Sequence, residues 1–326
     1  MKIATGTGKS GEVSFDQPLR ALIWMVVSGL GFTGMSVLVK RLSGFGLGAS
    51  ALVFSRSLVN AVVALAIVYG RKRNPWPKTT KRILALRGIA GFLGLTCLFY
   101  GLAHLPLPVA SLLNWCSPVF VILFSRLFLR QATQPRALGL IAVSFSGLIL
   151  VLMPSELGLV ALHQGLWSWT AIAVGLTGAA FGAIAFLAVR RATSEQPTEV
   201  IVLWFTAMAT LLSLPWFLIE TSTWLPRLQE HPSLWLQLLF LGLFATLGQF
   251  AMTLAYRYAQ APIVSSMSLM NAGFMAAAGW WFFGEVLRPI QTLGVLIMAF
   301  GVAQLGAPWP FGRKKTTQTS LPLINQ

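Results

Sequence analysis

The polar residue that stands out most in the sequence is an arginine inside a long apolar stretch. Arg56 lies about eight residues into the apolar run 48–69, which places it about 12 Å from one end of a helix. A guanidinium at that depth in a membrane costs at least about 2.5 kcal/mol unless it faces protein or water. Asn60 follows one turn later on the same helix face. We predict an anion-attracting or gating pair on a solute path; structural bonds to backbone carbonyls are the alternative.

Two other apolar runs carry polar side chains spaced by three or four positions, which puts them on one face of a helix. Amides and hydroxyls in lipid need partners, so both faces should point into the protein. Within the run, Pro118 also removes one backbone hydrogen bond and can free a carbonyl for a solute. Solute binding and hydrogen bonding between helices both explain these faces, which hold Ser111, Asn114, Trp115 and Pro118 in the run 107–129, and Ser265, Ser268 and Asn271 in the run 263–283.

Further candidates come from isolated residues in other runs. Tyr100 and Gln249 each share a face with threonines, and Trp204 lies deeper in its run than the tryptophans that mark run ends. Glu285 closes the run 263–283 and is the candidate gating carboxylate. Arg87 and Arg126 lie near run ends, where long side chains are expected to reach out to the interface.

Catalysis, a cofactor and a metal are not expected. The segment 29–34 matches a dinucleotide-binding glycine pattern, but no strand precedes it and no acidic residue follows at the required distance. The segment 7–10 resembles the end of a phosphate-binding loop, but position 3 holds Ile3 instead of glycine. The three histidines are scattered over predicted loops, and the two cysteines lie in apolar runs.

Composition identifies the class of protein. The chain has 326 residues, of which 56% are hydrophobic and 10% charged, against about 25% charged in a soluble domain. The net charge of +16 would suggest a nucleic-acid partner in a soluble protein, but a mean hydropathy of +0.74 excludes that class. The sequence therefore predicts an integral membrane protein whose partners are the lipid bilayer and a small-molecule solute, with no nucleic acid.

The apolar runs predict an all-α polytopic protein with ten transmembrane helices. A span needs about 20 helical residues, and Pro, Gly or charged residues separate candidate spans at 21–39, 48–69, 83–103, 107–129, 136–153, 167–189, 200–220, 234–255, 263–283 and 290–306. Seventeen Lys and Arg fall on the side of the termini and four on the other side. This bias predicts a multi-pass protein of the inner (plasma) membrane with both termini cytoplasmic.

An internal repeat divides the spans into two sets of five. At an offset of 155, Phe128 aligns with Phe283 and Gly139 with Gly294. Because five is odd, the second set should be inverted relative to the first. We expect a polar tail at 1–19, repeats at 20–154 and 155–306, and a second tail at 307–326.

Several motifs together resemble those of the drug/metabolite transporter superfamily, EamA type, over about residues 20–306. They are Phe54-Ser55-Arg56, the stretch 99–110, Ser117-Pro118-Val119-Phe120 and Phe283-Gly284-Glu285. One departure is Leu129-Arg130, where the family usually has Gly-Glu. The resemblance implies movement of small organic solutes by alternating access.

The sequence therefore predicts a secondary, non-ATP transporter of a small organic metabolite, polar or anionic, with a central cavity between two inverted repeats. No carboxylate relay is expected in the membrane interior, which favours exchange or facilitated movement. A membrane-embedded enzyme and a non-transporting scaffold are the alternatives. The Gly178–Gly182 pair fits close helix packing either within one chain or in a homodimer.

Overall fold

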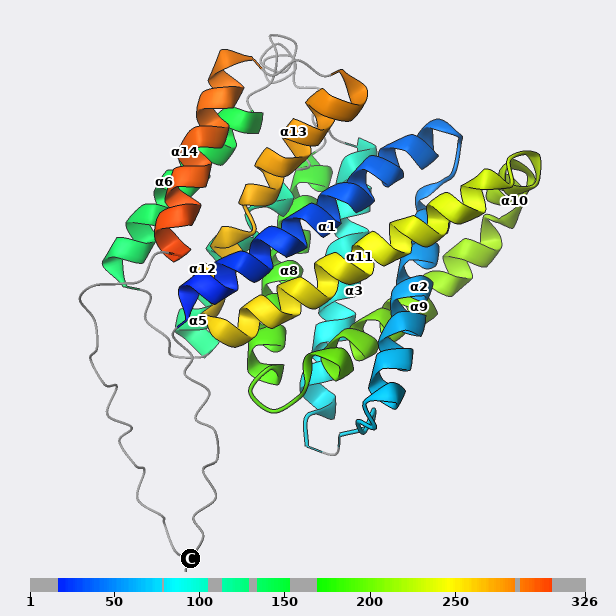
Figure 1. Cartoon of the computed structure of the whole chain (residues 1–326), viewed down its shortest axis with the longest axis horizontal. Helices are drawn as coiled ribbons and strands as arrows, with labels where there is room; N and C mark the ends of the chain where they lie inside the picture. Colours follow the sequence, from blue (N-terminus) through cyan, green and yellow to red (C-terminus); the bar gives the residue numbers. More distant parts are fainter. Residues whose placement is uncertain are drawn as a thin grey trace, which may run out of the picture.

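A computed structural model describes residues 17–77, 79–104, 113–128, 134–152, 169–284 and 288–306 (Figure 1). These residues form helices joined by turns and contain no strand. The helices are α1 (Pro18–Gly44), α2 (Ala49–Gly70), α3 (Lys81–His104), α5 (Ser117–Phe128), α6 (Pro135–Leu152), α8 (Trp169–Ala192), α9 (Thr198–Ile219), α10 (Thr221–Glu230), α11 (Ser233–Tyr258), α12 (Ala261–Met267), α13 (Met270–Phe283) and α14 (Pro289–Gly306).

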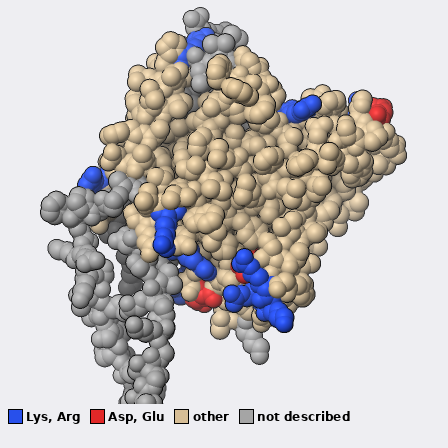
Figure 2. All heavy atoms as spheres, viewed as in Figure 1, with Lys and Arg blue, Asp and Glu red and all other residues tan. Residues whose placement is uncertain are grey.

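The helices have the lengths that a membrane requires. Within the described residues, α1, α2, α8, α9, α11 and the combined segment α12–α13 are each long and apolar enough to cross a bilayer, while α5, α6 and α14 are shorter apolar helices. Figure 2 shows a broad surface without charged side chains, with most of the visible basic side chains gathered along its lower edge. An all-helical membrane protein is confirmed; the count of ten spans stays a prediction.

Two of the predicted spans are interrupted. In the ninth span, α12 ends at Met267 and α13 begins at Met270, so the helix breaks at Ser268 and Leu269. In the fourth span, a turn at Trp115 and Cys116 precedes α5. Each broken segment has polar groups beside the break, where backbone hydrogen bonds span three residues, as from the Asn271 N–H to the Ser268 carbonyl at 3.1 Å.

The structure changes the role expected of Pro118. This residue lies in the first turn of α5, where a missing N–H removes no bond within the helix. The Asn114 carbonyl, which an N–H at position 118 would have reached, accepts a hydrogen bond from Ser117 Oγ at 2.7 Å. The carbonyl that we expected to be free for a solute is therefore already engaged.

Helix α10 was not expected from the sequence, because Pro226 and Pro232 suggested a loop there. It lies between α9 and α11 and buries Trp224 and Leu228. These two side chains join an apolar cluster with Leu52 of α2 and Leu241 of α11. The cluster closes the corner between α2 and α11.

Long helices from distant parts of the chain lie side by side. Helix α1 packs along α11 and α8 packs along α3; α2 packs on α11 and α9 packs on α3. In Figure 1 the blue α1 and the yellow α11 run next to each other. Two further pairs, α2–α9 and α6–α14, join equivalent positions of the two predicted repeats.

Glycines allow two of these pairs to approach at backbone distance. A Cβ at Gly31 of α1 would lie 2.6 Å from the Gly248 nitrogen of α11. A Cβ at Gly178 of α8 would lie 2.6 Å from Cys97 Cβ of α3, and Gly182 lies beside Gly94. The Gly178–Gly182 motif is therefore used for packing within the chain.

Candidate functional site

A cavity of about 230 Å³ lies where the two long helix pairs meet. Residues of α1, α3, α5, α8, α9, α11 and α13 line it, together with the segment before α5 and the break between α12 and α13. It is slightly smaller than pockets that hold drug-sized ligands. Its size and its position among the helices suit a small solute.

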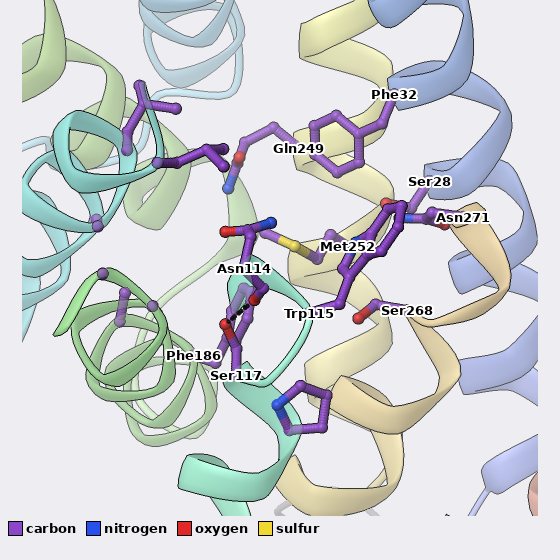
Figure 3. Close-up of a pocket in the computed structure, with 18 of the residues that line it drawn as sticks. Ser28, Phe32, Asn114, Trp115, Ser117, Phe186, Gln249, Met252, Ser268 and Asn271 are labelled. Carbon is purple, nitrogen blue, oxygen red and sulfur yellow. Dashed lines mark hydrogen bonds between the residues drawn. The ribbon is translucent and has the colours of Figure 1, made fainter. Parts of the chain in front are cut away.

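Most of the polar residues proposed from the fourth, eighth and ninth spans meet at this cavity. Figure 3 shows the side chains of Asn114 and Gln249 near one another, with Trp115 and Asn271 on the other side of the pocket. Ser268, at the break of the ninth span, and Pro118 also contribute to the lining. The structure brings these six residues together, and their role in binding a solute stays a prediction.

Four proposed residues lie outside the cavity lining. Arg56 is half-buried on α2, and Asn60 is buried on the same helix with no hydrogen-bond partner for its Oδ1. Tyr100 is 40% exposed. Trp204 donates a hydrogen bond from Nε1 to the Pro75 carbonyl, 2.8 Å away, and thus packs on the turn that follows α2. The remaining two candidates, Ser111 and Glu285, lie outside the described residues.

Arg87 is the charged residue of the described cavity lining, and the sequence did not predict it there. We expected its side chain to reach the membrane interface, but it is 3% exposed and lines the cavity. Its guanidinium carbon lies 3.9 Å from the centre of the Phe205 ring on α9, within the range of a cation–π interaction. The prediction that the Arg87 side chain reaches the membrane interface is therefore wrong. Arg126, for which we made the same prediction, is exposed.

The glycines around Arg87 were the signal that could have revealed this position. Gly88, Gly91 and Gly94 follow it on α3. A Cβ at Gly91 would collide with Arg87 Nη1 and would lie 2.8 Å from Phe205 Cε2. The missing side chain at Gly91 thus leaves room for the guanidinium to fold back along its own helix instead of extending to the interface.

The hydroxyl groups of the three serines in the described lining donate hydrogen bonds to backbone carbonyls. Ser28 donates to the Gly248 carbonyl at 2.9 Å, Ser117 to the Asn114 carbonyl, and Ser268 to the Ser265 carbonyl at 2.6 Å. Within the described residues, Arg87 and the side-chain amides of Asn114, Gln249 and Asn271 make no hydrogen bond. The side chains of the described lining whose N–H groups make no hydrogen bond are therefore one guanidinium, three amides and the Trp115 indole.

The buried Glu199 and the half-buried Glu220 lie away from the cavity lining. Glu199, at the start of α9, lies 3.5 Å from Arg71 and 3.6 Å from Arg73. Glu220, after the end of α9, accepts hydrogen bonds from Ser50 at 2.6 Å and from Trp216 at 2.8 Å. Both acids connect α9 with neighbouring segments at the helix ends.

The remaining lining is apolar and rich in aromatic side chains. Phe32 of α1, Phe186 of α8 and Met252 of α11 form much of the wall that Figure 3 displays. Aromatic walls with a few polar groups are typical of sites for organic molecules. The arrangement suits an organic molecule that carries a hydrogen-bond-accepting group.

Comparisons with known proteins agree with this architecture. One solved crystal structure is similar to this chain, with a TM-score of 0.66 and 17% sequence identity. The match covers 85% of this chain and 95% of the chain in the crystal structure. At this level of identity the likeness shows a shared fold.

Curated relatives cover nearly the whole described helical region. The pseudopaline exporter CntI of Pseudomonas aeruginosa is 32% identical over 85% of this chain and 93% of its own. The riboflavin transporter of Rhizobium johnstonii is 27% identical over 86% and 90%. The human solute carrier family 35 member G1 is 24% identical over 82% and 74%. The model of the EamA-like transporter family matches twice, at residues 19–153 and 169–306. The chain belongs to this family and is a membrane transporter of small metabolites.

Proposed function

We propose that the chain is a secondary transporter that carries its solute by alternating access through the cavity of about 230 Å³. The observation that carries this proposal is the position of the cavity. Its walls come from both long helix pairs, α1–α11 and α3–α8. A change in the angle between the pairs would open the cavity to one side of the membrane and close it to the other.

The packing of the helices supports two inverted repeats of five spans. When α1, α2, α3, α5 and α6 are matched with α8, α9, α11, α13 and α14, the neighbours in one half correspond to those in the other. The α1–α11 contact then corresponds to α8–α3, and the α2–α11 contact to α9–α3. The family model matches the chain once in each half. We therefore propose a boundary between residues 154 and 155, with polar tails before residue 20 and after residue 306.

The two broken spans are the proposed moving parts. The breaks at Trp115–Cys116 and at Ser268–Leu269 occupy comparable places in the two halves, and both lie at the cavity. Interrupted helices at a midplane site are a recurring feature of transporters with inverted repeats. Few backbone bonds need to change at such a break when one half tilts against the other.

The membrane orientation follows from the charges at the helix ends. We propose that the chain is a multi-pass protein of the bacterial inner membrane, with the ends of α8 and α11 on the cytoplasmic side. Arg190, Arg191 and Arg257 lie at these ends, and Arg71 and Arg73 lie in the turn after α2. This agrees with the excess of basic residues in cytoplasmic loops.

The solute in this proposal is a small organic metabolite, and transport needs neither a cofactor nor a catalytic step. Two relatives are named for pseudopaline and riboflavin, both organic molecules. Because no carboxylate occurs in the described lining, we propose exchange or facilitated movement instead of a central proton relay. Both wall pairs come from one chain, so the mechanism requires no second copy.

Cysteine labelling tests alternating access without knowledge of the solute. In a chain with Cys97 and Cys116 replaced by serine, Gln249→Cys should react with a membrane-impermeant thiol reagent in both right-side-out and inside-out vesicles. Ser213→Cys is the control, because Ser213 is fully buried on α9 and does not line the cavity. Labelling of position 249 from one side only, or from neither, would contradict the proposal.

A further inference from the structure

The chemistry of the cavity is set by a charge that the protein itself does not balance. Arg87 is 3% exposed, and within the described residues no carboxylate pairs with it and no acceptor reaches its guanidinium. A buried guanidinium without a counter-charge is costly, and such residues inside membranes mark substrate or ion pathways. A solute that brings its own negative charge would remove this cost.

The neighbours of Arg87 hold the guanidinium without using its hydrogens. The Phe205 ring stacks at 3.9 Å and offers its face, and Gly91 leaves the space that the guanidinium fills. A cation–π contact leaves the N–H groups at the edge of the guanidinium plane free for another partner. The Arg87 side chain is thus held in position, and its N–H groups remain available to a solute.

The other polar groups of the cavity point to the same kind of solute. Asn114, Gln249 and Asn271 provide amide donors, whereas the serine hydroxyls already donate to backbone carbonyls. A carboxylate accepts hydrogen bonds at both oxygens and fits a guanidinium through two parallel bonds. A single lining cation balances one negative charge, which a carboxylate carries and a phosphate ester exceeds.

We propose that the solute is a small organic carboxylate whose carboxylate binds Arg87 and whose apolar body lies along the aromatic wall of the cavity. This inference rests on the proposed transport function and specifies its solute class. The wall is formed by Phe32, Trp115 and Phe186. The volume of about 230 Å³ limits the body to a few rings or a short chain.

Matched acids and amides test this assignment. The purified full chain in detergent is heated with phenylacetate, indole-3-acetate or benzoate, with the corresponding primary amide of each, and with phenyl phosphate. Binding to the folded state raises the apparent melting temperature. At least one acid should stabilise the chain, and its amide and phenyl phosphate should bind about ten- to a hundredfold more weakly. Equal stabilisation by an acid and its amide, stronger binding of phenyl phosphate, or no stabilisation by any acid would overturn the proposal.

Variants of two arginines distinguish direct binding of the carboxylate by Arg87 from a general effect of positive charge near the cavity. Arg87→Gln should remove the preference for the acid, and Arg87→Lys should keep part of it because the charge remains while the paired donors are lost. Arg56→Gln is the matched control; Arg56 lies within electrostatic range of Arg87 but does not line the cavity. An undiminished preference in Arg87→Gln, or an equal loss in Arg56→Gln, would contradict the assignment.

The ligand-free melting temperature distinguishes a binding residue from a structural one. Since Arg87 lacks an ionic partner, Arg87→Gln should leave that temperature unchanged or raise it. A lowered value would show that Arg87 supports the fold. Gly91→Ala provides a second route, because the added methyl displaces the guanidinium and Phe205 while the charge stays. It should weaken acid binding at least about tenfold, and unchanged binding would count against the geometry.

Transport separates this inference from the function on which it rests. The acid that stabilises best is loaded into proteoliposomes, and counterflow of the labelled acid is measured with the wild-type chain and Arg87→Gln. Arg87-dependent binding without counterflow would refute transport and leave the binding site intact. Counterflow that proceeds equally with Arg87→Gln would refute the carboxylate assignment and leave transport intact.

Discussion

Helices α3 and α11 occupy equivalent places in the two proposed repeats, yet the residues around them differ. Gly88 and Gly94 of α3 have the same spacing as Gly242 and Gly248 of α11. Gly88 faces Met208 of α9, and Gly242 faces Val59 of α2. The glycines therefore set the same packing in both halves.

The residue before the first of these glycines differs between the two halves. On α3 this residue is Arg87, which lines the cavity, and on α11 it is Leu241, which is fully buried in the apolar cluster with Trp224 and Leu52. The aromatic partner differs in the same way: Phe205 lies three residues before Met208 on α9, and the residue three before Val59 on α2 is Arg56. The glycine spacing is shared, whereas the charged side chain of the described cavity lining comes from the first half alone. In the proposed mechanism, the shared packing would serve the motion, while the asymmetric side chains would recognise the solute.

The largest loss of stability is expected when the second half is given an arginine at the position that matches Arg87. Leu241→Arg would bury a guanidinium in the apolar cluster of α2, α10 and α11, among hydrophobic side chains. An uncompensated buried charge costs about 3–5 kcal/mol. We expect a strongly lowered melting temperature and a broadened size-exclusion profile in detergent. Wild-type stability of this variant would show that the surroundings of position 241 on α11 accept a charge as those of Arg87 on α3 do.

A smaller effect tests whether the glycine contacts of the two halves are equivalent. Gly31→Ala would place a methyl 2.6 Å from the Gly248 nitrogen, and Gly178→Ala would place one 2.6 Å from Cys97 Cβ. Each should destabilise the chain by about 1–3 kcal/mol through overpacking. Gly139→Ala on α6 is the control, since no atom lies within 4 Å of that methyl, and it should be neutral or stabilising. The comparison is measured by thermal unfolding; an effect in only one of the two crowded variants would break the equivalence.

The sequence predicted the architecture better than the site. Long apolar runs and charged separators are local features, so the helices and their approximate ends could be read directly. The breaks at Trp115–Cys116 and Ser268–Leu269 could not, because polar residues beside a break also occur in continuous helices that hydrogen-bond to their neighbours.

Arg87 shows why part of the site escaped prediction. Its distance along the chain from a helix end suggested an interfacial position, but Phe205 and Gly91 turn the guanidinium into the cavity. That outcome depends on which helix packs against α3, which is a tertiary property. Asn114, Gln249 and Asn271 were identified because buried amides must face protein in any packing.

The smallest effect concerns two adjacent arginines at the end of α8. Arg190 donates to the Tyr256 carbonyl at 2.7 Å and thereby ties α8 to the end of α11, whereas Arg191 forms an exposed pair with Glu195 at 3.4 Å. Arg190→Gln should cost about 1 kcal/mol and should increase labelling of Gln249→Cys from the cytoplasmic side. Arg191→Gln should change stability by less than about 0.5 kcal/mol and leave labelling unchanged. If both variants label alike, the tie between α8 and α11 does not hold the cytoplasmic side closed. If Arg190→Gln alone opens that side, closure depends on a side-chain-to-backbone bond between the two helix pairs, and the pairs move as units.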